Sequence, residues 1–183
     1  MIYKILNSYA EKLEDFLGSV IHQPGGIVKV GDIAAEEKEE ILNKLVIALL
    51  SIERDTSQGV VPVHVRNNAG GFNYGQPPLN MNLNVVLAAV YDPRRYGDGL
   101  SVLSSAILFL QANPFFTGTG GQKYVTEIVT LASEELSNLW TYMGGRYYPS
   151  VVIKIRKVVF DAGEIKGVNK QAGRPSVETG DKK

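Results

Sequence analysis

The clearest pattern in this chain is a strict alternation of apolar and polar residues that begins at residue 79. In the stretch "LNMNLNVV", leucine, methionine and valine alternate with asparagine. Because successive side chains of a β-strand point to opposite faces, this stretch predicts a strand over Leu79–Tyr91. One of its faces carries the amides of Asn80, Asn82 and Asn84. They are candidate interface residues, although a sheet with one solvated face explains them equally well.

Apolar residues at spacings of three and four predict three helices, over residues 2–17, 96–112 and 133–143. Gly18 is expected to end the first helix, and Asn113-Pro114 the second, because proline cannot continue a helix. Ser133 is the expected N-cap of the third, which ends at Gly144-Gly145. The second helix is apolar nearly all round. We therefore expect burial on two sides, by the sheet and by another helix or a neighbouring subunit.

Three further segments fix the predicted fold class. The apolar run Ile41–Arg54 favours a strand buried on both faces over a helix, and Tyr124–Leu131 and Val151–Phe160 are also predicted strands. The sequence thus predicts an α+β fold, with a mostly antiparallel sheet of about four strands packed with three helices. Residues 1–162 are expected to form one domain and residues 163–183 a flexible tail. Residues 55–78 are predicted to be a long loop with a short extended piece at Val60–Val65.

The composition of the chain excludes some kinds of site and disfavours several kinds of partner. The chain of 183 residues has no cysteine, which excludes disulfides and thiolate metal sites and suits synthesis in the cytoplasm. Nineteen basic and nineteen acidic residues cancel, whereas nucleic-acid binders usually carry excess positive charge. No stretch has the apolar length of a membrane span or the h-region of a signal peptide. We therefore expect no nucleic acid as partner and no direct membrane insertion.

No motif in the chain indicates catalysis. The segment "GTGGQKY" of residues 118–124 is rich in glycine, but it lacks the Lys-Ser/Thr pair and the strand-then-helix order of phosphate loops. The two histidines, His22 and His64, stand far apart with no metal-binding spacing. The sequence therefore predicts no catalytic residue, no metal site and no cofactor.

Charged and aromatic residues indicate surfaces for association instead. The segment "YDPRRYGDG" contains Arg94 and Arg95, which are expected to make local ion pairs or to contact a partner. Arginine and tyrosine are common at interface hot spots. Further candidate interface residues are therefore Arg146, Tyr147, Tyr148, Lys154 and Arg156.

The order of motifs in the second half resembles a known bacterial family. The segments "PPLNMNLNVVLAAVYD", "LSVLSSAILFLQANPFF" and "ASEELSNLWTYMGGRYYPSVVIKIRKVVFD" follow one another as in the tube-end cap proteins of extracellular contractile injection systems. These include the caps of the antifeeding prophage and of the Photorhabdus virulence cassette. The resemblance covers residues 2–162. The family-motif residues, for which a structural role is expected, are Asn113, Pro114, Leu139, Trp140, Pro149 and Ser150.

The resemblance implies a tail-terminator-like, ring-forming fold without catalysis or cofactor. Such caps form a ring, usually a hexamer, on the distal end of the inner tube and meet the last sheath layer. The expected partners are therefore further copies of this chain, the tube protein and the sheath protein. The loop of residues 55–78 or the tail is hypothesised to fold on the tube or sheath. The alternatives are a phage or pyocin-like tail-completion protein, and a small ligand-binding module or enzyme.

Overall fold

A computed structural model describes residues 1–22, 25–33, 43–57, 63–66, 72–75, 78–161 and 165–169. The chain forms two compact units, Met1–Asp55 with Asn80–Val158, and Thr56–Leu79 with Val159–Lys183. The division into a 1–162 domain and a 163–183 tail remains a prediction. None of the described helices combines the length and apolar character that crossing a bilayer requires.

Helix α1 spans Ile2–Ile21, so the predicted first helix is confirmed, but the expected end at Gly18 is wrong. An interior glycine costs only about 1 kcal/mol relative to alanine, which the packing of the buried stripe offsets. The helix ends at His22, whose backbone is left-handed with a φ of 57°. The Glu14 carboxylate then accepts hydrogen bonds from the backbone N–H groups of Ile27 and Val28. These bonds hold the start of the next strand against α1.

The first unit contains a six-stranded mixed sheet in the order β1-β2-β5-β8-β7-β6. The strands are β1 Val28–Val30, β2 Lys44–Arg54, β5 Leu79–Val90, β6 Phe115–Thr117, β7 Lys123–Val129 and β8 Ser150–Phe160. The α+β class is confirmed, but the predicted number of about four strands is wrong. Both extra strands, β1 and β6, have three residues, too few to show a periodicity. Strand β1 runs parallel to β2, while the β2–β5, β7–β8 and β6–β7 pairs are antiparallel.

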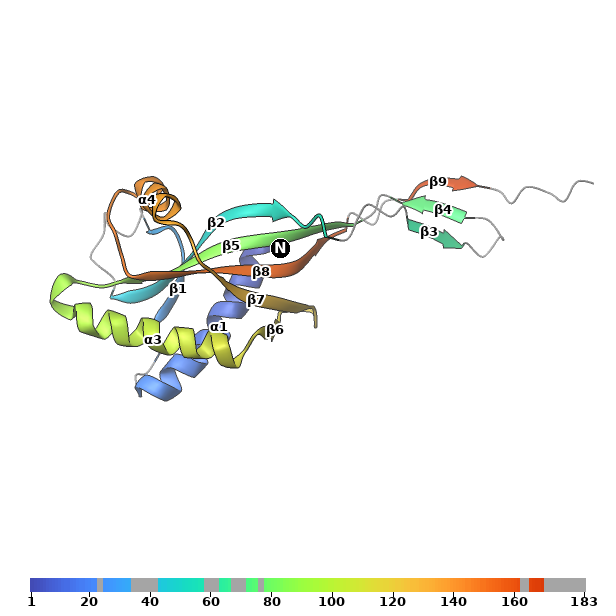
Figure 1. The fold of residues 1–183 in the computed structure, drawn as a ribbon. Helices are drawn as coiled ribbons and strands as arrows, with labels where there is room; N and C mark the ends of the chain where they lie inside the picture. The colour runs from blue at the N-terminus through green and yellow to red at the C-terminus, as the bar shows by residue number, and fades with distance from the viewer. Residues whose placement is uncertain are drawn as a thin grey trace, which may run out of the picture. The chain divides into compact units, whose positions relative to one another are not determined.

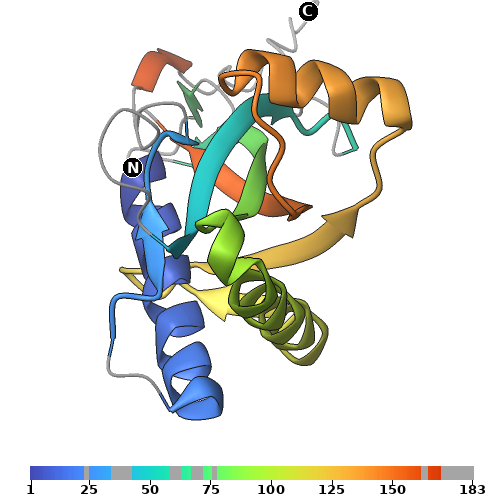
Figure 2. The same ribbon diagram turned by 90° about the vertical axis from the view of Figure 1, so that its left-hand side faces the viewer.

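Helices cover both faces of this sheet, as Figures 1 and 2 show: α4 lies on one face, and α1 and α3 lie on the other. Helix α3 spans Tyr96–Ala112 and α4 spans Ser133–Tyr142. The even-numbered residues Val86, Ala88 and Val90 of β5 pack in one cluster with Trp140 of α4. On the opposite face, Tyr9 of α1 contacts Phe109 of α3, with 6.0 Å between the ring centroids.

Two details of the helices differ from the prediction. The N-cap of α4 is Ala132 rather than Ser133, and its N–H donates to the Glu135 carboxylate at 2.9 Å. Helix α3 is buried along one side only. Its buried residues are Gly99, Val102, Leu103, Ala106, Phe109 and Leu110. Leu100, Ile107 and Leu108 stay exposed in the single chain, so no described helix covers this side, and its burial by a neighbouring subunit remains a prediction.

The second unit contains a three-stranded antiparallel sheet in the order β3-β4-β9. Its strands are β3 Val63–Arg66, β4 Phe72–Gly75 and β9 Ile165–Asn169. Strands β3 and β4 lie in the 55–78 segment, which was predicted to be a long loop with one short extended piece, and β9 lies in the 163–183 segment, which was predicted to be a flexible tail. The expected extended piece at Val60–Val65 falls partly on β3, and residues 60–62 lie outside the described ranges. These strands were missed because β4 and β9 are far apart in sequence and carry few apolar residues.

Candidate interaction surfaces

The first candidate surface is formed by two segments that are far apart in the sequence. We call Arg94, Arg95, Arg146, Tyr147 and Tyr148 the arginine–tyrosine surface. Arg94 and Arg95 belong to a short 3₁₀ helix, Pro93–Arg95, that leads into α3, and the other three follow α4. The backbone N–H of Ala89 donates to the Pro149 carbonyl at 2.9 Å, which holds the second segment beside the end of β5. Both segments line a small pocket of about 210 Å³.

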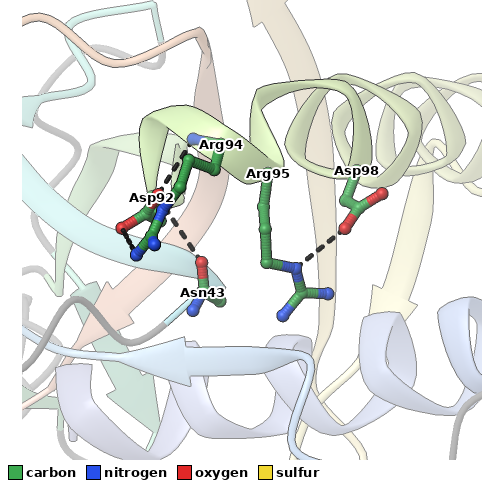
Figure 3. Close-up of polar contacts among 5 residues, drawn as sticks. All are labelled: Asn43, Asp92, Arg94, Arg95 and Asp98. Atoms are coloured by element: carbon green, nitrogen blue, oxygen red, sulfur yellow. Dashed lines mark hydrogen bonds and ion pairs between the residues drawn. The ribbon is translucent and has the colours of Figure 1, made fainter.

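Local ion pairs fix the first of these segments, as expected (Figure 3). Asp92 accepts hydrogen bonds from the backbone N–H of Arg94 at 2.9 Å and from its Nε at 3.0 Å. Arg95 Nε donates to Asp98 at 2.8 Å. The Asp92 N–H donates to the side-chain oxygen of Asn43, which ties this turn to the start of β2. The Arg94 hydrogen bonds lower the pKa of the Asp92 carboxyl below its ordinary value, and Arg94 stays 89% exposed.

Aromatic rings also support Arg95 and Arg146. The Arg95 guanidinium lies 5.9 Å from the centroid of the Tyr91 ring, and that of Arg146 lies 5.1 Å from the Tyr148 ring. Tyr148 is buried beside Trp140, whereas Tyr147 is 61% exposed. Cation–π contacts restrain an arginine without consuming its hydrogen-bond donors. This surface therefore presents guanidinium groups and a tyrosine in a fixed arrangement.

A close packing contact beneath this surface leads to a stability prediction. A Cβ on Gly99 of α3 would lie 3.1 Å from the Tyr91 ring, whereas a Cβ on Gly97 would meet nothing within 4 Å. We therefore expect Gly99→Val to lower the free energy of unfolding by about 1–3 kcal/mol through overpacking. The matched Gly97→Val change should be close to neutral. Urea unfolding of both variants tests this, and equal stabilities would contradict it.

The second candidate surface is a strip of polar side chains on the sheet. It lies on the α4 face by strand register, beyond the apolar cluster that α4 covers. We call it the polar strip, and it consists of Ser51, Glu53, Asn82, Asn84, Glu127, Lys154 and Arg156. The sequence did not indicate Ser51, Glu53 and Glu127 as candidate interface residues. The polar end of the β2 segment, "SIER", was the available signal, but only the β2–β5 register places it opposite the asparagines.

Hydrogen bonds connect the polar strip across four strands. The Asn84 amide donates to Ser51 Oγ at 2.9 Å and to the Glu53 carboxylate at 2.6 Å. Lys154 donates to Glu53, and Arg156 donates to Glu127, each at 3.0 Å. Asn82 is only 8% exposed, and its side-chain oxygen has no hydrogen-bond partner among the described residues. The side-chain oxygen of Asn84 also has no partner there, so the hydrogen-bonded strip retains two unsatisfied acceptors.

The pairing of Glu53 predicts a pH-dependent contribution to stability. Hydrogen bonds from Lys154 and then Asn84 lower the pKa of the Glu53 carboxyl below its ordinary value of 4.5. A carboxyl whose pKa is lowered by folding stabilises the fold above its unfolded pKa and loses that contribution as pH falls through the folded pKa. At pH 7, Glu53→Gln should therefore cost at most about 1 kcal/mol, because the pair is partly exposed.

Denaturant unfolding at pH 7 and near pH 3 would check this prediction. The difference between wild type and Glu53→Gln should be smaller near pH 3 than at pH 7, because it is lost as pH falls through the lowered pKa of Glu53. Glu11→Gln, at an exposed position of α1, is the matched control and should change little at either pH. A cost of Glu53→Gln that is equal at both pH values would contradict the assignment.

The family-motif residues lie at the junctions of elements. Asn113 ends α3, with its N–H and side-chain amide both donating to the Phe109 carbonyl. The Pro114 carbonyl accepts from the backbone of Thr126 in β7. Leu139 and Trp140 lie on the inner side of α4, while Ser150 is the first residue of β8 and Pro149 directly precedes it. Each motif therefore fixes the position of a neighbouring element.

Residues 4–171 of the sequence match the Pvc16 N-terminal domain family. The chain belongs to this family. Two solved structures have the same fold as this chain, and both are cryo-EM structures. One is the PVC sheath/tube terminator of an extracellular contractile injection system in the extended state, with a TM-score of 0.69, 15% identity and 100% of this chain covered. The other is the tube-terminating cap of the anti-feeding prophage, with a TM-score of 0.65, 14% identity and 96% of this chain covered.

These comparisons confirm the family resemblance expected from the sequence. The matched chain spans 64% of the length of the first of these proteins and 60% of the second. A comparison with curated protein sequences finds no match. Among the described residues, no group of three or more His, Cys, Asp and Glu side chains could hold a metal ion.

Proposed function

We propose that this protein is a structural cap of a contractile injection system. It closes the distal end of the inner tube as a ring and also contacts the last sheath layer. The family match over residues 4–171 is the observation that carries the proposal. The fold shared with a sheath/tube terminator and with a tube-terminating cap supports it. The proposal assigns no catalysis and no cofactor to the chain, and it places synthesis in the cytoplasm before assembly into the particle.

The exposed apolar side of α3 supports self-association. Leu100, Ile107 and Leu108 are 39%, 40% and 58% exposed on this helix. Tyr96, at its first turn, is also exposed and lines the pocket of the arginine–tyrosine surface. A neighbouring copy packed on this side would remove apolar area from water, at about 25 cal/mol per Å². We assign α3 and the adjoining arginine–tyrosine surface to the contact between copies.

A ring explains how modest contacts can terminate a polymer. The open end of a tube repeats around its axis, so a ring with matching symmetry binds it at several points at once. Each further contact then forms at a high effective concentration, and the combined affinity exceeds that of any single contact. We assign the polar strip to contacts with the tube or sheath protein, and we propose that the ring is a hexamer.

The mass of the protein in solution tests self-association. Light scattering should give about 120 kDa, six copies of the 20.0 kDa chain. Ile107→Glu combined with Leu108→Glu should dissociate the ring, since burying two new carboxylates is costly. Ser137→Glu combined with Asn138→Glu adds the same two charges at exposed positions of α4, away from the exposed side of α3, and should leave the ring intact. Equal masses for the two variants would contradict the assignment of α3.

The capping role itself is tested in particles. A strain that makes the injection system without this protein should produce tubes of irregular length, or particles that lose their sheath, in negative-stain images. Complementation with wild type should restore uniform particles, whereas the Ile107→Glu, Leu108→Glu variant should not. Uniform, sheathed particles in the complete absence of the protein would overturn the proposed function.

A further inference from the structure

A lysine-lined groove at the free edge of the sheet has no part in the proposed capping contacts. The groove has a volume of about 740 Å³, within the range of about 300–1,000 Å³ that is usual for ligand sites. Residues 115–117 of β6 line it, and β6 is the last strand of the sheet. Lys12 of α1, Lys123 of β7 and Lys157 of β8 line it as well. The groove thus combines a strand edge with three cationic side chains.

The backbone of β6 presents unpaired hydrogen-bonding groups at this edge. Gly118 N–H donates to the Gln122 carbonyl, and Thr126 N–H donates to the Pro114 carbonyl. In an antiparallel ladder the hydrogen-bonded positions alternate, so Phe116 faces β7 while Phe115 and Thr117 direct their N–H and C=O groups outward. No hydrogen bond joins these outward groups to another described residue. This edge can therefore accept another strand.

The side chains around this edge indicate what kind of peptide segment could pair with β6. Phe115 is 63% exposed in the groove and offers an aromatic surface to an apolar side chain. None of the three lysines has an ion pair within the part of the chain that the structure describes, and Asp15 is the single acidic residue of the lining. Lys157 holds a φ of 66°, a conformation that costs a non-glycine residue energy and interrupts the regular strand at the groove. The excess of positive charge selects for an anionic ligand.

From these observations we propose that the groove binds an acidic, extended segment of a partner protein by strand addition to β6. The segment pairs with the outward backbone groups of Phe115 and Thr117. One of its apolar side chains packs on Phe115, and its carboxylates lie near Lys12, Lys123 and Lys157. A peptide suits the site better than a nucleic acid, because the strand edge recognises a peptide backbone and the chain has no excess positive charge. The site does not depend on the capping role.

Fluorescence anisotropy with the full chain and labelled short peptides tests this proposal. The probe alternates valine and glutamate, and the control peptide has lysine in place of every glutamate. We expect saturable binding of the acidic peptide, weakened by added salt, and no binding of the basic one. No saturable binding of the acidic peptide up to millimolar concentration, or equal binding of the two peptides, overturns the proposal.

Two variants test separately how the strand edge and the lysine charge contribute to peptide binding. Thr117→Pro removes one outward N–H without touching the ladder to β7, and Lys123→Glu reverses one groove charge. Each variant should bind the acidic peptide about tenfold more weakly than wild type does, and its circular dichroism spectrum should be unchanged. Lys4→Glu, at an exposed position of α1 outside the groove, is the matched control and should bind like wild type. Wild-type affinity in both groove variants overturns the proposal.

Two further results would assign the groove to another occupant and so overturn the proposal. A single-stranded oligonucleotide that competes as well as the unlabelled acidic peptide would make it a general anion site. A lower mass of Lys123→Glu in light scattering would make it a contact between copies of this chain. We expect neither, so the solution mass of Lys123→Glu should equal that of wild type. Loss of peptide binding alone leaves the capping role intact, and loss of capping alone leaves this site intact.

Discussion

Replacing Trp140 by alanine is expected to lower the free energy of unfolding by about 3–5 kcal/mol, the usual cost of deleting a large buried aromatic side chain. Trp140 is 5% exposed and is the only buried side chain of α4. It packs against β2, β5 and β8 through Val46, Val86 and Val152. The large effect follows because Trp140 is the one buried side chain of this helix, whereas Leu136 and Leu139 are only partly buried against the same cluster.

The same substitution should loosen the arginine–tyrosine surface. The Trp140 ring lies 5.6 Å from the ring of Tyr147 and 5.9 Å from that of Tyr148, centroid to centroid. The backbone carbonyl of Trp140 also accepts a hydrogen bond from the Gly145 N–H at 2.8 Å, and this bond closes the turn after α4. Without the indole, both tyrosines lose an edge-on aromatic neighbour, and such pairs are worth about 0.5–1.5 kcal/mol each.

Thermal unfolding followed by circular dichroism is the appropriate measurement, because the variant lacks the chain's single tryptophan. Trp140→Phe keeps an aromatic ring in the cluster and should recover much of the loss. Tyr142→Ala is the control on the same helix, because Tyr142 is 88% exposed and its truncation should cost little. A Trp140→Ala variant as stable as Tyr142→Ala would show that α4 is held by other contacts.

Tyr9 should respond to two substitutions with opposite signs. Its side chain is fully buried among Phe109 and Phe116, at centroid distances of 6.0 and 5.1 Å. Tyr9→Ala should therefore cost about 3–5 kcal/mol of unfolding free energy. The hydroxyl, however, has no hydrogen-bond partner among the described residues, and burial raises its pKa far above the ordinary value.

Removing only that hydroxyl should stabilise the protein. A buried polar group without a partner costs about 1–3 kcal/mol, so Tyr9→Phe is expected to raise the free energy of unfolding by about 1 kcal/mol. Urea unfolding of wild type, Tyr9→Phe and Tyr9→Ala would give both values. A destabilising Tyr9→Phe would mean that the hydroxyl has a partner in solution, such as a buried water molecule.

The strand β5 shows how far a local pattern reaches. Its alternation predicted the strand and placed Asn80, Asn82 and Asn84 on a common face. The pattern did not show that Asn82 is buried or that Asn84 bonds to Ser51 and Glu53 of β2. Those facts depend on the register of two strands, which a bulge between Leu49 and Ser51 shifts. Strand periodicity says which residues share a face, while the neighbouring strand decides what they meet.

Helix α3 shows a different limit. Its residues are apolar on nearly every side, so the sequence predicted the helix and its end at Asn113 but not which side of the helix faces the core. The positions of α1 and the sheet select the side with Gly99, Ala106 and Phe109 for the core. The remaining apolar residues, Ile107 and Leu108 among them, become an exposed surface. Both groups are equally apolar, so nothing local distinguishes a core residue from an exposed one here.

The sequence by itself determined the three helices, the four longer strands of the first sheet, the stops at Asn113 and Gly144, and the resemblance to tube-end caps. All of these depend on neighbouring residues or on the order of motifs along the chain. Tertiary structure alone decided the pairing of β4 with β9, the inclusion of β1 and β6, and the meeting of Pro93 with Arg146 around one pocket. These features join residues far apart in sequence or strands of three residues. Their free energy comes from pairing and burial between elements, which no local periodicity encodes.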